Sequence, residues 1–183
     1  MRAHFRDPDA VAAMGEQIAA NWGMPTQFVH LPALRLSYEC FTKFVWARFQ
    51  ADMSVQVQSA VILLKRCLPK MAKVPESRVL FILSSVTRAT PPKFMSMYTV
   101  AKYAPLGLMR ALGAEYAATE VRINAISPGM VETQFLEEIA EVALKMSASG
   151  HPLGRNAVPE DLLGAMELCC RPGQVTSVEW IFP

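Results

Sequence analysis

Three side chains in this chain are spaced as an acid–base site would need them. Ser85 follows the apolar run RVLFIL, and Tyr98 and Lys102 come thirteen and seventeen residues after it. On the helix expected to begin near Tyr98, residues four apart share a face, so the Lys102 ammonium can lie beside the Tyr98 phenol. A neighbouring cation stabilises a phenolate and lowers the tyrosine pKa, as a proton donor needs. Ser85 could then hydrogen-bond the same substrate oxygen.

Helical and strand-like segments alternate along the chain. Strands are expected at 26–31, 78–83, 121–127 and 177–182, and helices at 7–23, 38–72 with a break near 52–54, 98–119, 134–148 and 159–170. This alternation predicts an α/β fold: a Rossmann-like parallel sheet with helices on both faces, which binds ligands beyond the carboxyl ends of its strands. Ser85 and the turn at Pro128 and Gly129 both follow predicted strands, so they are expected at that edge.

Composition narrows the class of protein. The 183 residues fit one domain, and 52% of them are hydrophobic, with no uninterrupted apolar run that could span a bilayer. A membrane is therefore not an expected partner. The net charge of +2 comes from interspersed signs with no basic stripe, so nucleic acid is not an expected partner either. The start MRAHFRDPDAV has no apolar segment after its arginines, which predicts a cytoplasmic protein.

Four matches in order resemble the short-chain dehydrogenase/reductase family, of the 3-oxoacyl-carrier-protein-reductase-like type. The first two are the serine and the Tyr-x-x-x-Lys set described above. VRINAISPGMVET is similar to the family's sixth strand and Pro-Gly turn, and HPLGRNAVPEDLLGAMELCC is similar to its Pro-Leu-Gly-Arg and Pro-Glu segment. Single Tyr-Lys pairs are common on helices, whereas the ordered series is specific.

The resemblance implies a catalytic role for four residues. Tyr98 would be the acid or base, Lys102 would lower its pKa and bind the cofactor ribose, and Ser85 would hold the carbonyl oxygen. Alignment through LPKM puts Gln56 where the family has a helix asparagine that links the lysine to water, and glutamine offers the same amide one methylene farther out. His30, alone on an apolar strand, is interpreted as a core imidazole without chemistry.

The resemblance also implies NADP or NAD as cofactor. The backbone at Pro128, Gly129 and Val131, with the Thr133 hydroxyl and Lys102, would meet the nicotinamide end. The nine glycines include no closely spaced trio after a strand, so the family's pyrophosphate turn has no counterpart. By this comparison the first two strands and their helices are missing, and residues 1–183 would be a single, amino-terminally truncated domain.

The expected substrate is a small carbonyl or alcohol compound. An acyl or otherwise hydrophobic group would suit soft methionine side chains, which are expected to fill core and pocket gaps at Met95, Met97, Met109, Met130 and Met146.

Three roles remain open from the sequence. The chain could be an oxidoreductase of carbonyl reductase or alcohol dehydrogenase type. It could be a non-catalytic or partner-dependent subunit, forming a homo-oligomer or pairing with a full-length paralogue through the apolar helices at 54–71 and 98–119 and through an exposed edge at FVHL. It could also be a fragment of a longer reductase.

Overall fold

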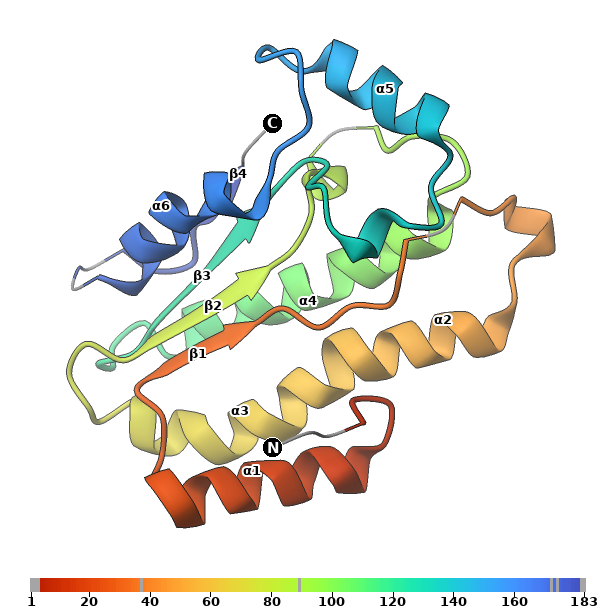
Figure 1. The fold of residues 1–183 in the computed structure, drawn as a ribbon. Helices are drawn as coiled ribbons and strands as arrows, with labels where there is room; N and C mark the ends of the chain where they lie inside the picture. The colour runs from red at the N-terminus through yellow and green to blue at the C-terminus, as the bar shows by residue number, and fades with distance from the viewer. Residues whose placement is uncertain (1–3, 37, 89, 172, 174, 182–183) are drawn as a thin grey trace.

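One parallel sheet organises the protein. The computed structural model describes residues 4–36, 38–88, 90–171, 173 and 175–181 (Figure 1). Within them the sheet has the order β1-β2-β3-β4, and every neighbouring pair is parallel. The strands are β1 (Gln27–His30), β2 (Arg78–Ile82), β3 (Arg122–Ser127) and β4 (Glu179–Ile181). The predicted parallel α/β sheet is confirmed.

Helices cover both faces of this sheet (Figure 1). Alternate strand residues face opposite sides: Val79 and Phe81 of β2 pack in the large core with the helices at Ser59–Met71 and Ser96–Glu115, whereas Leu80 packs with the helix at Pro159–Cys170. Phe81 and Leu80 are fully buried, as expected for a strand covered twice. The main helices are α1 (Pro8–Trp22), α3 (Ser59–Met71) and α4 (Ser96–Glu115) on one face and α6 (Pro159–Cys170) on the other.

The first helix is built as its sequence predicts. Asp7 caps α1 by accepting hydrogen bonds from the amides of Asp9 and Ala10, and Pro8 occupies the first turn, where no partner for an amide is needed. Gly23 ends the helix with φ of 81°, a left-handed conformation that glycine adopts without strain. The helix then packs against α3, which covers the sheet.

The long helix predicted at 38–72 begins later than expected. Residues Phe41–Lys43 form only a 3₁₀ turn, and α2 runs over Trp46–Met53, because Val45 is extended and acts as the helix cap. The expected break near 52–54 is instead a π-helical turn at Ser54–Gln58, which leads directly into α3. Such wide turns interrupt the hydrogen-bond register without ending a helix, and they are frequent at functional sites.

Two further boundaries differ from the sequence prediction. The helix expected at 134–148 splits into a 3₁₀ turn at Gln134–Leu136 and α5 at Glu141–Gly150, with Ala140 extended between them. The α4 helix stops at Glu115, four residues before the predicted end. The strand expected at 177–182 is the short β4, and Phe182 lies outside the described residues.

The β1 strand forms an edge of the described sheet. It pairs with β2 alone, and two apolar side chains at this edge are exposed, Val29 of β1 by 42% and the following Leu31 by 61%. The sequence predicted this edge. The described helices include no segment that combines the length and the apolar character required to cross a bilayer.

Candidate active site

Parallel pairing of β2 and β3 continues beyond the strand ends and places two turns side by side. The Leu83 amide donates to the Ile126 carbonyl oxygen at 2.8 Å, and the Ser85 amide donates to the Pro128 carbonyl oxygen at 2.9 Å. The backbone of the serine turn is thereby fastened to the turn that contains Gly129. This is the carboxyl edge of the sheet, where parallel α/β folds bind their ligands.

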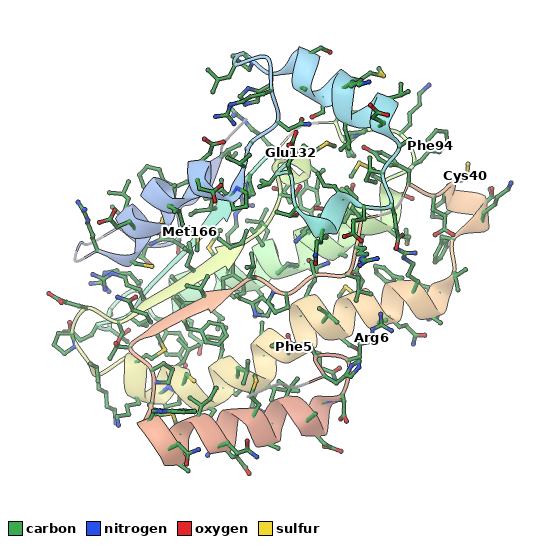
Figure 2. All side chains as sticks on the ribbon, viewed as in Figure 1. Phe5, Arg6, Cys40, Phe94, Glu132 and Met166 are labelled. Atoms are coloured by element: carbon green, nitrogen blue, oxygen red, sulfur yellow. The ribbon has the colours of Figure 1, made fainter. Side chains whose placement is uncertain are left out.

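A cavity of about 1120 Å³ opens at this edge. Met166 of α6, labelled in Figure 2, contributes to its wall. The predicted site residues in its lining are Ser85, Tyr98, Lys102, Pro128, Gly129, Val131 and Thr133. The structure therefore brings together all of the predicted residues except Gln56, which is absent from the lining.

Tyr98 is held as a neutral phenol. Burial raises the pKa of Tyr98 to about 12, a hydrogen bond with the Ser84 side chain partly offsets this effect, and the Asp52 carboxylate and Tyr38 add to it. The sequence-based expectation of a lowered pKa is wrong for this structure, because desolvation of the phenolate outweighs the hydrogen bond with Ser84 and the nearby Asp52 charge acts in the same direction as desolvation. Near neutral pH, the Tyr98 phenol is therefore protonated.

Lys102 is a buried cation next to this phenol. Its side chain is only 4% exposed, and the ammonium nitrogen lies 5.8 Å from the centroid of the Tyr98 ring. Burial lowers the pKa of Lys102 from 10.5 to about 8, while the Asp52 carboxylate acts in the opposite direction. The i, i+4 spacing on α4 thus produces the predicted Tyr–Lys neighbourhood, and the charge is maintained at neutral pH.

Gln56 lies behind the cavity in the π-helical turn. It is 2% exposed, and its side-chain amide donates to Asp52 Oδ1 at 2.7 Å. Its backbone carbonyl is 2.9 Å from His30 Nε2, and because a carbonyl oxygen only accepts, Nε2 must carry the hydrogen. Burial lowers the pKa of His30 to about 4, so the ring is neutral. The interpretation of His30 as a satisfied core imidazole is confirmed.

Two residues that the sequence reasoning did not select contribute to this site. Ser84 lines the cavity and hydrogen-bonds Tyr98, whereas the prediction chose the adjacent Ser85 from its spacing. Asp52 influences the pKa of both Tyr98 and Lys102. The signal for Asp52 was its position four residues before Gln56, which places both side chains on one helix face.

The remaining wall is mostly apolar. Leu36, Met95 and Leu136 form a buried cluster against which Tyr98 packs. Of the methionines expected to fill gaps, Met95 and Met130 do line the cavity and Met109 lies in the core, but Met146 is 70% exposed. The expectation for Met146 is wrong, because α5 directs it away from the core.

The fold is a parallel α/β sheet with a cavity at its carboxyl edge, and sequence comparison identifies the family. A family model described as enoyl-(acyl carrier protein) reductase matches residues 1–174. The chain belongs to the short-chain dehydrogenase/reductase family.

Curated relatives from several organisms match part of the chain. Human dehydrogenase/reductase SDR family member 2, mitochondrial, is 33% identical over 124 residues, which are 66% of this chain and 43% of that protein. Human dehydrogenase/reductase SDR family member 4 is 29% identical over 134 residues, which are 70% of this chain and 46% of that protein. The chain spans less than half the length of these relatives.

Solved structures share the fold over nearly the whole chain. A dehydrogenase/reductase from Sinorhizobium meliloti superimposes with a TM-score of 0.88 at 19% identity, covering 100% of this chain and 71% of that one. A blue fluorescent protein from a metagenomic library, in complex with NADPH, gives a TM-score of 0.87 at 18% identity, covering 98% of this chain and 72% of that one. At these identities the likeness shows the fold.

Replacing the buried cation should stabilise the fold. A Lys102→Met variant keeps a side chain of similar length and removes the cost of burying a charge, so its free energy of unfolding at pH 7 should rise by about 1–3 kcal/mol. The folded-state pKa is lowered, so the unfolded chain binds the extra proton between pH 8 and 10.5. The advantage of the variant should therefore be full below pH 8 and disappear as pH rises to 10.5.

Urea unfolding at pH 7 and at pH 10 measures this effect. The matched control is Lys65→Met at an exposed position of α3, which should change the free energy of unfolding by less than about 0.5 kcal/mol at both pH values. A Lys102→Met variant less stable than the wild type at pH 7 would contradict a buried, costly charge.

Proposed function

We propose that the chain is the substrate-side part of an NAD(P)-dependent oxidoreductase that reduces a carbonyl group. The observation that carries this proposal is the convergence, on one cavity, of the Tyr98 phenol, the Lys102 ammonium, the Ser84–Ser85 hydroxyls and the backbone turn at Pro128. A proton donor, a cation and hydroxyl groups around one apolar-walled cavity suit the reduction of a carbonyl to an alcohol.

The residues present fit the nicotinamide half of the cofactor. Lys102 borders the cavity, and none of the ion pairs among the described residues involves it, so its ammonium can donate to ribose hydroxyls. The backbone at Pro128 and Gly129 lines the cavity and could contact the nicotinamide. Val131 and Thr133 line the same cavity farther along the chain. The sequence has no glycine-rich turn for the pyrophosphate, so only this half of NADP or NAD is accounted for.

Residues of this chain would donate the proton that the reduction needs and stabilise the charge that remains. Reduced nicotinamide, when bound, supplies the hydride. Tyr98 donates its phenolic proton to the substrate oxygen as negative charge develops there, and the Lys102 cation stabilises the phenolate that remains. A serine hydroxyl holds the same oxygen. Because the pKa of Tyr98 is raised, the resting phenol is protonated, which favours the reducing direction.

Gln56 would take part from behind the cavity. Its amide already donates to Asp52, and the Asp52 charge acts on both Tyr98 and Lys102. In this proposal Gln56 keeps Asp52 in place, and Asp52 favours the charged form of Lys102. The apolar cluster at the wall suits a hydrophobic substrate, which agrees with an acyl or other apolar carbonyl compound.

The exposed β1 edge supports a second role. Exposed apolar residues at an edge strand favour association with another polypeptide segment. We propose as the alternative a partner-dependent domain, whose β1 edge is covered by a full-length paralogue or by a second copy of the chain. In that case the isolated chain would turn over slowly or not at all, and mixing it with the partner would restore activity.

Tyr98→Phe should abolish carbonyl reduction. The variant keeps the ring and loses the proton donor, so turnover followed by NADPH oxidation should fall at least about a hundredfold. The matched control is Tyr116→Phe at the end of the same helix, which should stay within about twofold of the wild type because it lies outside the cavity. Retained turnover in a folded Tyr98→Phe variant would refute Tyr98 as the proton donor.

The two adjacent serines can be separated in the same assay. Because the Ser84 hydroxyl contacts Tyr98, Ser84→Ala should lower kcat about a hundred- to a thousandfold, the range for loss of one donor at a developing oxyanion. Ser85→Ala tests the residue that the spacing selects. An effect confined to Ser85→Ala would show that the Ser84 contact belongs to the resting state only, and two unaffected variants would remove the serine role altogether.

A further inference from the structure

One carboxylate lies beneath both turns of the cavity. Glu179 of β4 accepts hydrogen bonds at the same oxygen, Oε1, from Thr87 Oγ1 at 2.8 Å and from the Ser127 hydroxyl. Thr87 belongs to the 3₁₀ turn Ser85–Thr87, and Ser127 is the last residue of β3, directly before Pro128. A single atom thus joins the serine turn to the turn proposed to meet the nicotinamide.

These bonds are shielded from water. Thr87 is 8% exposed and Ser127 is fully buried, and only 10% of the Glu179 side chain is exposed. Hydrogen bonds to a charged acceptor are about twice as strong as neutral ones, and buried ones are screened little. The other carboxylate oxygen lies 3.4 Å from the Arg110 guanidinium, which is exposed and contributes little by comparison.

The Thr87 hydroxyl also links this carboxylate to Ser84. Thr87 Oγ1 lies 2.8 Å from the Ser84 carbonyl oxygen as well as from Glu179, and its single hydrogen can serve one of the two at a time. The ionised carboxylate is the stronger acceptor. Tyr103 of α4 donates to the Thr87 carbonyl oxygen at 2.8 Å, so the same turn is held to the helix that carries Tyr98.

The position of β4 depends on a close contact between the segment before it and α4. The segment before this strand runs so close to α4 that a Cβ atom added at Gly113 would lie 1.9 Å from Ser177 Oγ, so glycine is required there. Ser177 adopts a left-handed φ of 60° at the same place, and its amide donates to the Ile123 carbonyl oxygen at 2.7 Å. Because of this close approach, the three-residue β4 places Glu179 next to the serine turn and the Pro128 turn.

We propose that Glu179 is a positioning residue that fixes the distance between the serine turn and the Pro128 turn through Thr87 and Ser127. The inference rests on the proposed function, because that spacing matters for turnover only if the hydride and the proton reach one carbonyl group from these two turns. Misplacement of catalytic groups by about 1 Å can cost about a hundredfold in rate, so loosening this junction should lower kcat.

Two variants test the inference, with a matched control for each. Glu179→Ala removes the acceptor, and Arg110→Gln removes only its exposed ion pair. Thr87→Val removes one hydroxyl at constant shape, and Thr119→Val removes a helix-end hydroxyl that bonds Tyr116 away from the cavity. Thr87→Val keeps the test decisive if Glu179→Ala does not fold.

The first readout is hydrogen exchange of the Ser85 amide, which the bond to Pro128 protects. Exchange should accelerate about tenfold or more in Thr87→Val and Glu179→Ala and change by less than about twofold in both controls. The second readout is steady-state kinetics with NADPH. The same variants should lose about tenfold in kcat with the cofactor KM unchanged, because the turns lose alignment while the cofactor contacts persist.

Rescue by a conservative change completes the design. Glu179→Gln keeps an oxygen that can accept from Thr87 and Ser127, so it should recover most of the exchange protection lost in Glu179→Ala. Protection and kcat in Thr87→Val equal to those of Thr119→Val would overturn the inference. If the wild-type chain shows no turnover, the proposed function fails, whereas the exchange result still decides whether Glu179 holds the two turns.

Discussion

The parallel pairing of β2 with β3 is the constraint on which the site depends. Hydrogen bonding between the two segments continues past the strands, to the contact between the Ser85 amide and the Pro128 carbonyl oxygen. Parallel strands end at the same edge, so the serine turn and the Pro128 turn emerge together, and α4 passes beneath them with Tyr98 and Lys102. The proposed roles of Ser85, Tyr98 and Lys102 and of the Pro128 turn all depend on this common edge.

A costly charge at this edge indicates function rather than stability. Lys102 is buried on a helix whose other inward residues, such as Leu106 and Met109, are apolar, and desolvation lowers its pKa. Buried ionisable groups with perturbed pKa values concentrate in active sites. The Asp52 carboxylate, at the end of α2, offsets part of this cost. The π-helical turn supplies Gln56, whose side-chain amide donates a hydrogen bond to that carboxylate.

The sequence predicted the parts of the site that depend on local spacing. The four-residue separation of Tyr98 and Lys102 and the placement of Ser85 and Pro128 after apolar strands were enough to bring these residues to one cavity. The helix start at 38 was wrong because Val45 is extended, which residue periodicity does not reveal. The direction of the Tyr98 pKa shift was wrong because burial depends on packing from distant segments. Local spacing could not indicate Glu179 either, because its hydrogen-bond partners lie 92 and 52 residues away in the sequence.

The central claim is that this cavity receives a nicotinamide next to Tyr98 and Lys102. A titration of the purified chain with NADPH and with NADH, followed by nicotinamide fluorescence, tests it most directly. The account predicts saturable binding of at least one cofactor below about 1 mM, weakened in Lys102→Met because the ribose loses its donor. A flat titration up to that concentration for both cofactors would contradict the claim for the isolated chain.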